Sequence, residues 1–279
     1  MVFLAVVAYL PIGYAIALSF LKKTAFSPVS AFAGLRNYRL IVEEPDLWAA
    51  LWRSVVFTAG AVALQVALGL AAALLLNRAF RGQTFVRSIF VLPYLLPTIV
   101  VALVFQWLLN QEYGVVNQLL MQTGLLTRPI NFLGGLDTAM WSVIATSGWQ
   151  YGSFATLLFL ARLQAIPPRL YEAAKVSGAG PLRCFLDVTL PNLRTTLLLV
   201  ALLRGIWMFN KFDTIWLMTH GGPLKATETL PLYAYRLAFE DFDFGMAAAA
   251  CTVMFVVLVA GAAVYFKLFD PSREVEVGR

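Results

Sequence analysis

The sequence predicts an all-α polytopic membrane protein with six transmembrane helices and a pair of short helices in a cytoplasmic loop. Of its 279 residues, 60% are hydrophobic and only 13% are charged. A water-soluble domain carries about 25% charged residues and about 45–50% apolar ones. The apolar residues also gather in six windows of about 20 residues, the length that crosses a bilayer. This composition excludes a disordered chain, a disulfide-rich secreted domain and an ordinary cytosolic enzyme.

We expect the whole chain, residues 1–279, to form a single transmembrane domain. The six windows cover approximately residues 1–21, 55–76, 88–109, 139–161, 195–217 and 244–266. The first window has neither the basic segment nor the small-residue cleavage site of a secretory signal, so it is expected to be a retained span. Pro93 and Pro97 predict a break or kink in the third window, because proline removes a backbone donor. The segment Arg81–Pro97 is therefore expected to form an interfacial elbow that leads into a span.

The distribution of basic residues predicts the orientation of the spans. Lys and Arg are more frequent on the side that holds the loop Asn77–Arg87, the stretch Arg162–Arg194 and the tail with Lys267, Arg273 and Arg279. Basic loops stay in the cytoplasm, so both termini are expected there, although the first outer loop is itself basic. The formal net charge of +6 has the same explanation and does not require a nucleic-acid partner.

The longest cytoplasmic loop, residues 166–194, has the pattern of two short helices. Pro168 predicts a helix start, and Gly178 predicts its end, because glycine adopts the left-handed conformation of a C-cap. Pro181 opens a second, amphipathic helix, which Pro191 is expected to end. From these residues alone, the loop is either a surface connector between two spans or a rigid element that transmits force from a soluble partner.

The sequence predicts no metal or nucleotide site within the chain. Cys184 and Cys251 lack a CxxC partner, and His220 is the single histidine, so a metal centre or a histidine-based dyad is hard to assemble. The chain also has no Gly-Lys dipeptide, and therefore no phosphate-binding loop for ATP.

The spacing of a few residues in the long loop matches a known pattern. These residues are Glu172, Ala173, Ala174, Gly178, Leu190 and Pro191. The pattern resembles the EAA loop of bacterial ABC importer permeases, with Val188 where isoleucine is usual and Ser177 where an acidic residue is common. Three further segments resemble the carbohydrate-uptake branch of that family: Ser88–Pro97, Phe209–Pro223 and Ala226–Gly245. The chain is most similar to the first of the two permeases in a maltose- or glycerol-phosphate-type system.

The resemblance implies a translocation subunit of an ATP-driven, binding-protein-dependent importer of a sugar or related polyol in a bacterial or archaeal cell membrane. The implied partners are a second permease forming a heterodimer, two cytoplasmic ATPase subunits, an extracytoplasmic solute-binding protein and the lipid bilayer. The loop would be a coupling helix pair, in which Glu172 makes a charge-assisted contact with the ATPase. Ala173 and Ala174 would allow close approach, and Gly178 would supply the turn. ATP and Mg would be bound by the ATPase, so this chain is expected to be no enzyme and to hold no cofactor.

Polar residues inside the predicted spans are candidates for a substrate pathway, because charges there are costly. One face of the fifth window carries Arg204, Trp207, Lys211 and Thr214 at helical spacing, with Asn210 and Asp213 beside it. Such a stripe suits a hydrated cavity that hydrogen-bonds hydroxyl groups and stacks on a sugar, above all at Trp207 and Asn210. For the three charged residues, ion pairing between helices is an equal alternative. For Gln150 and Tyr151 in the fourth window, helix packing is the stronger alternative.

Two other functions remain as alternatives. A secondary transporter would need paired broken helices in two repeated halves, and the sequence shows one such break, in the third window. An intramembrane serine protease would need Ser153 and His220 within hydrogen-bond reach, but His220 is expected to lie outside the bilayer.

Overall fold

The structure of the chain is a computed structural model that describes residues 2–27, 30–78 and 80–269. Met1, where the first predicted span begins, and Arg273 and Arg279 of the basic tail lie outside the described residues. The described chain is helical apart from one two-stranded antiparallel sheet. Its elements, in chain order, are α1 (Val2–Ser19), β1 (Leu21–Lys22), β2 (Ala31–Phe32), α2 (Arg36–Glu43), α3 (Pro45–Leu76), α4 (Gln83–Leu95), α5 (Thr98–Leu108), α6 (Val115–Gln122), α7 (Ala139–Ala165), α8 (Pro168–Val176), α9 (Pro181–Arg183), the π-helical segment η1 (Cys184–Thr189), α10 (Leu190–Phe209), α11 (Asp213–Thr219), α12 (Leu230–Phe239) and α13 (Phe244–Leu268).

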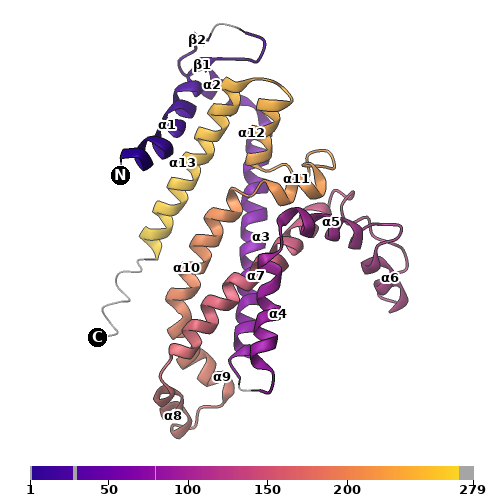
Figure 1. Cartoon of the computed structure of the whole chain (residues 1–279), viewed down its shortest axis with the longest axis vertical. Helices are drawn as coiled ribbons and strands as arrows, with labels where there is room; N and C mark the ends of the chain where they lie inside the picture. The colour runs from indigo at the N-terminus through magenta and orange to yellow at the C-terminus, as the bar shows by residue number, and fades with distance from the viewer. Residues whose placement is uncertain (1, 28–29, 79, 270–279) are drawn as a thin grey trace.

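The molecule is elongated, with long helices running between two ends that differ in structure (Figure 1). One end holds α8 and α9, and the opposite end holds the β1–β2 hairpin, α2 and α12. Helix α3 makes its most extensive contact with α7, and α1 packs against α13. Helices α5 and α6 project to one side of this bundle.

Small residues bring α3 and α7 close together. A Cβ at Gly148 of α7 would overlap the side chain of Leu64, and one at Gly69 of α3 would lie 2.5 Å from the Cβ of Ala155. Membrane helices commonly pack through such small residues. This contact fixes α7 against α3 and so positions the polar side chains that α7 carries.

Three described helices are long and apolar enough to cross a membrane: α3, the continuous helix Pro181–Phe209, and α13. Helices α4 and α5 together pass the same test as one bent span. Helix α7 has 27 residues but is not in this set, because it carries many Ser, Thr and Gly residues, most of which are buried. The described residues therefore contain three or four candidate spans, and the number six stays a prediction.

The third predicted window is interrupted, as its prolines indicate. Helices α4 and α5 meet at an angle of 95°, with Leu96 and Pro97 extended between them. The break lies at Pro97, whereas Pro93 is accommodated inside α4. The second window is longer than predicted, because α3 already begins at Pro45. A proline at this position and Asp46 beside it both favour a helix N-terminus.

The prediction that Pro191 ends the second loop helix is wrong. Helix α9, η1 and α10 form one continuous helix, and Pro191 lies in the first turn of α10. The N–H of Leu190 donates to the carbonyl of Phe185, five residues back, as in a π-helix. We attribute the tolerance of Pro191 to this wider turn, which relieves the clash that proline makes with the preceding turn of an α-helix. The first loop helix, α8, begins at Pro168 and is followed by Gly178 with φ of +80°, as predicted.

The fifth window is also not one helix. Helix α10 ends at Phe209, and α11 begins at Asp213. The side chain of Asn210 donates from Nδ2 to the carbonyl of Ile206, 2.9 Å away, and so satisfies one of the last carbonyls of α10. The predicted single stripe is therefore wrong beyond residue 209, and Thr214 is fully buried instead.

An ion-pair cluster ties together the end of the molecule that holds α12. The guanidinium of Arg236 lies 2.7 Å from Glu228, 3.1 Å from Asp241 and 3.3 Å from Asp46. Burial lowers the pKa of Arg236, but the hydrogen bond and charge of Glu228 outweigh this effect, so the pKa lies above its ordinary value. Lys225 also contacts Asp46, which links α12 and the preceding loop to the start of α3.

We expect Arg236→Met to lower the free energy of unfolding by about 3 kcal/mol, because it leaves the buried Glu228 without its cation. Unfolding of the purified protein in detergent, followed by its loss of helical signal, measures this change. The matched control is Arg39→Met, whose ion pair with Glu43 is exposed and contributes at most about 1 kcal/mol. Equal losses for the two variants would contradict a stabilising role of the cluster.

Candidate functional site

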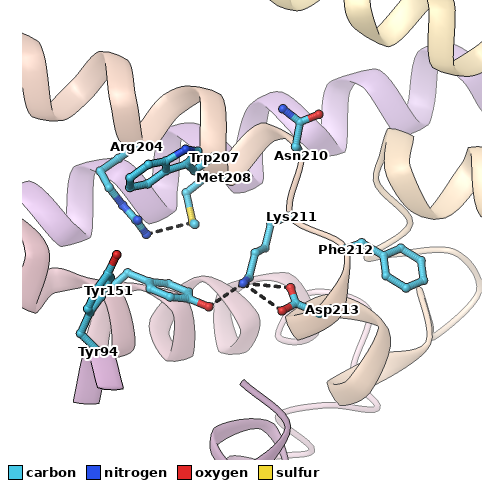
Figure 2. A pocket seen from close by; sticks show the side chains of 9 residues that line it. All are labelled: Tyr94, Tyr151, Arg204, Trp207, Met208, Asn210, Lys211, Phe212 and Asp213. Atoms are coloured by element: carbon cyan, nitrogen blue, oxygen red, sulfur yellow. Dashed lines mark hydrogen bonds and ion pairs between the residues drawn. The ribbon is translucent and has the colours of Figure 1, made fainter. Parts of the chain in front are cut away.

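A cavity of about 500 Å³ lies where the break between α10 and α11 meets α4 and α7 (Figure 2). Its lining residues are Tyr94, Tyr151, Arg204, Trp207, Met208, Asn210, Lys211, Phe212 and Asp213. A volume of this size is in the range of about 300–1,000 Å³ that small-molecule sites occupy.

Lys211 is the centre of a polar group inside this cavity. Its ammonium lies 2.9 Å from the carboxylate of Asp213 and donates a further hydrogen bond to the hydroxyl of Tyr151. The Lys211 side chain is only 14% exposed, whereas that of Asp213 is 48% exposed. Figure 2 shows the ammonium between the two oxygen-bearing groups. The cavity therefore offers a partly free carboxylate, whereas its ammonium is already engaged by two partners.

Two neighbouring residues of α7 contact the other break, between α4 and α5. The hydroxyl of Tyr151 also lies 3.2 Å from Thr98 Oγ1, at the start of α5. Gln150 donates from Nε2 to the carbonyl of Leu96, 3.2 Å away, inside the break. Tyr151 thus connects both interrupted regions to α7.

Arg204 lies deeper, beneath the aromatic lining, and is 2% exposed. Its Nε donates to Gln65 Oε1 at 2.6 Å, and its guanidinium carbon lies 4.7 Å from the ring centre of Tyr151. Among the described residues no carboxylate lies within the 4 Å of an ion pair with Arg204. The arginine is thus held by an amide and by aromatic faces. The interhelical ion pair, which the sequence analysis gives as an alternative for this residue, does not form.

Trp207 and Asn210 present the accessible polar and aromatic surface. Trp207 is 44% exposed, and Asn210 is exposed at the end of α10. In Figure 2 the amide of Asn210 points away from the group of Lys211, Asp213 and Tyr151. An indole face next to donors and acceptors can stack on the apolar face of a ring while hydrogen-bonding its hydroxyl groups.

Most of the predicted pathway residues come together here, although the helix that was expected to align them is broken. The residues that line the cavity as expected are Tyr151, Arg204, Trp207, Asn210, Lys211 and Asp213. Gln150 does not line it: its side chain is 1% exposed and turned toward Leu96. Sequence reasoning missed Tyr94, whose position next to Pro93 in the elbow gave no indication that α4 packs against α7.

The loop that resembles the EAA motif lies at the far end of the molecule from α12 (Figure 1). Glu172 and Ala173 are exposed, and Ala174 is half-buried. The hydroxyls of Tyr171 and Thr189 lie 3.0 Å apart, so the two limbs of the loop are joined. Four large apolar side chains are exposed on these limbs: Leu170 (38%), Val176 (90%), Leu182 (70%) and Leu186 (48%). These side chains give this end of the molecule an exposed apolar surface beside the charged Glu172.

In the part of the chain that the structure describes, no group of three His, Cys, Asp or Glu side chains could hold a metal ion. The free thiols of Cys184 and Cys251 lie in different helices.

Interrupted apolar helices around a polar and aromatic cavity are typical of membrane transport subunits. The chain belongs to the family described as binding-protein-dependent transport system inner membrane component, whose model matches residues 65–275.

Several relatives cover nearly the whole chain. The trehalose/maltose transport system permease protein MalF of Thermococcus litoralis is 34% identical over 259 residues, which are 93% of this chain and 87% of the relative. The sulfoquinovosyl glycerol transport system permease protein SmoG of Agrobacterium fabrum is 33% identical over 268 residues, which are 96% of this chain and 86% of the relative.

The fold is that of a solved importer. A chain of a bacterial ABC transporter involved in the import of the acidic polysaccharide alginate matches with a TM-score of 0.79 at 21% identity, over 95% of this chain and 92% of that one. A bacterial alginate ABC transporter in complex with an alginate pentasaccharide-bound periplasmic protein gives a TM-score of 0.81 at 19% identity, over 96% and 90% of the two chains.

These findings confirm the resemblance that the loop residues indicate. The chain is a permease subunit of a binding-protein-dependent ABC importer and a multi-pass helical membrane protein. They do not favour a secondary transporter or an intramembrane protease. In the fold, Ser153 lies in the middle of α7, whereas His220 follows α11 with φ of +52° as part of a turn.

We expect Tyr151→Phe and Lys211→Met to be non-additive in their effect on the free energy of unfolding. Because the hydroxyl and the ammonium are hydrogen-bonded, the coupling should be about 1 kcal/mol. Unfolding of the two single variants and the double variant in mixed detergent micelles measures it. The comparison pair is Tyr151→Phe with Lys225→Met. Lys225 lies in the ion-pair cluster around Arg236, so the effects of these two substitutions on the free energy of unfolding should be additive. Additivity in the first pair would show that the bond does not form in the folded protein.

Proposed function

We propose that this chain is the translocation subunit of an ATP-driven importer that carries a sugar or a related polyol, of the oligosaccharide or glycerol-phosphate type. The observation that carries this proposal is the cavity, whose lining includes an exposed indole, an amide, a carboxylate and two phenols. Hydroxyl groups need both donors and acceptors, and the flat apolar face of a sugar ring suits an aromatic surface. Two relatives are named for trehalose/maltose and for sulfoquinovosyl glycerol transport, which supports the same cargo class.

The proposal includes six spans with both termini in the cytoplasm. The long, largely buried helix α7 would be a span surrounded by other helices, and the remaining spans would include α1 and the bent pair of α4 and α5. The basic residues of loops 77–87 and 162–194 support the cytoplasmic location of α8 and α9. The β1–β2 hairpin and α12, at the opposite end (Figure 1), would then face the extracytoplasmic binding protein.

The proposed assembly pairs this chain with a second permease in a heterodimer and with two cytoplasmic ATPase subunits. The exposed residues Glu172 and Ala173 would enter a cleft of one ATPase. Gly178 would turn the chain, and Leu190 with Pro191 would lead back into the long helix. ATP and Mg would be bound by the ATPase alone.

Uptake by the reconstituted complex tests the proposal. The complex, purified through a tag on this chain and placed in proteoliposomes, should accumulate maltose, trehalose or glycerol phosphate only with ATP on the ATPase side and with the binding protein present. An ionophore that abolishes ion gradients should leave uptake unchanged. Uptake that persists without the ATPase and follows an ion gradient would contradict the proposal and support a secondary transporter.

We expect Glu172→Lys to reduce uptake at least about tenfold, because reversing the charge of a docking residue replaces an attractive contact by a repulsive one. The variant should insert into the membrane normally but co-purify with less ATPase. Glu112→Lys reverses an equally exposed charge between α5 and α6 and should leave ATPase association unchanged. Normal association of the Glu172→Lys variant would refute the docking role.

We expect Asn210→Ala to lower uptake several-fold while the complex still assembles, because the accessible amide in the cavity is lost. Thr252→Ala is the control. Thr252 donates from Oγ1 to the carbonyl of Ala248, four residues back in α13, at 2.8 Å, as Asn210 does to Ile206 in α10, but it does not line the cavity. If both variants lower uptake equally, the effect comes from the helix bond and not from cargo contact.

A further inference from the structure

Gln65 is a fully buried polar residue that lies outside the cavity and connects three helices. It lies on α3, and its Oε1 accepts a hydrogen bond from Arg204 Nε of α10 at 2.6 Å. Its Nε2 donates to the carbonyl of Ser147 on α7 at 3.4 Å. The relative exposure of Gln65 is 0%, so it can affect the cavity only through its neighbours.

The neighbour that depends on Gln65 is Arg204. Within the described chain, the amide oxygen of Gln65 is the one oxygen acceptor that the structure gives this guanidinium. A second contact joins Arg204 Nη2 to the sulfur of Met208 at 3.9 Å. The remaining contacts are aromatic: the guanidinium carbon lies 4.7 Å from the ring centre of Tyr151, 5.3 Å from Trp207 and 5.6 Å from Phe154. A buried cation without a carboxylate is costly, so the amide and the rings together must hold it in place.

The rings that hold Arg204 are also the surfaces of the cavity. Trp207 and Tyr151 both line it. Phe154 meets the Trp207 ring edge-on, with centroids 5.5 Å apart. In Figure 2 the guanidinium of Arg204 lies between Trp207 and Tyr151. A shift of the guanidinium therefore changes the support beneath the indole that the cavity exposes.

We infer that Gln65 is a positioning residue for cargo recognition: its amide fixes Arg204 within the aromatic group and thereby sets the orientation of Trp207. This inference rests on the proposed function, since it gives Trp207 the role of the surface on which the cargo stacks. It assigns the specificity of the cavity partly to a side chain that touches no cargo.

The orientation of Trp207 is tested without cargo, by ¹⁹F NMR of the assembled complex labelled with 5-fluorotryptophan. The Trp207 resonance is identified by its loss in Trp207→Phe. Gln65→Leu should shift or broaden this resonance, whereas Gln65→Glu, which keeps an acceptor for Arg204, should restore it. Gln83→Leu is the control: this glutamine at the start of α4 donates to the carbonyls of Leu76 and Arg78 and does not line the cavity, so its loss should leave the Trp207 resonance in place. A wild-type resonance in Gln65→Leu overturns the inference.

Gln65→Leu leaves a buried guanidinium without its oxygen acceptor, which can destabilise the folded protein. A second variant is therefore measured in parallel. Gln65→Leu combined with Arg204→Met removes both partners, which can be nearly neutral for stability. A merely structural role predicts that the double variant regains the Trp207 resonance and full transport. A positioning role predicts a folded complex in which Trp207 stays displaced.

Transport is measured as maltose or trehalose taken up per ATP hydrolysed in proteoliposomes. This ratio does not depend on the amount of folded complex. For Gln65→Leu and for the double variant it should fall roughly tenfold, the factor that a hydrogen bond to a charged group is worth. An unchanged ratio overturns the inference. If the wild-type complex transports no saccharide or polyol, the proposed function fails instead, and the Trp207 resonance alone decides the role of Gln65.

Discussion

A helix that breaks within a membrane protein frees carbonyl groups that have no water to bind, and each must find a donor inside the protein. This constraint explains the polar side chains between the helices. The carbonyl of Leu96, at the break between α4 and α5, accepts a hydrogen bond from Gln150. The carbonyl of Ile206, at the end of α10, accepts the backbone N–H of Asn210 and a second hydrogen bond from the side-chain amide of the same residue. The carbonyls of Leu217 and Met218, at the end of α11, both accept from Gln106. Side-chain amides thus stabilise three helix ends and leave the breaks in fixed positions.

Fixed breaks in turn produce the site. If α10 continued past Phe209, Lys211 and Asp213 would lie on the surface of one long helix. Because the chain turns at residues 210–212, they instead face Tyr151 of α7, which also contacts the start of α5. The cavity and the breaks are therefore consequences of the same hydrogen bonds, and α7, which packs closely on α3 through Gly148 and Gly69, contacts both breaks.

The sequence predicted the features that depend on local chemistry or on a fixed motif. The break at Pro97, the turn at Gly178 and the start of α8 at Pro168 follow from proline and glycine geometry, and the family follows from the spacing of the loop residues. The break at 210–212 was missed because the polar residues there were assigned to one face of a continuous helix, although Asn210 and Asp213 are residue types that favour helix ends. The contribution of Tyr94 and Gln65 could not be predicted, because it depends on tertiary contacts between helices far apart in the sequence.

The continuity of Pro181–Phe209 has a mechanical consequence for the proposed coupling. Helix α9, η1 and α10 form one rod of 29 residues, about 43 Å long at 1.5 Å per residue. One end of this rod is the loop that α8 joins through Tyr171 and Thr189, and the other end carries Arg204 and Trp207. A displacement of α8 by an ATPase would then reach the cavity along a single helix, without passing through a flexible joint.

The π-helical turn before Pro191 is the one irregular segment within that rod, and its wider hydrogen-bonded ring is the place where the rod would bend first. The stiffness of the path from loop to cavity is therefore set mainly by the packing around η1, where the buried Val188 joins the core of Phe159 and Leu193.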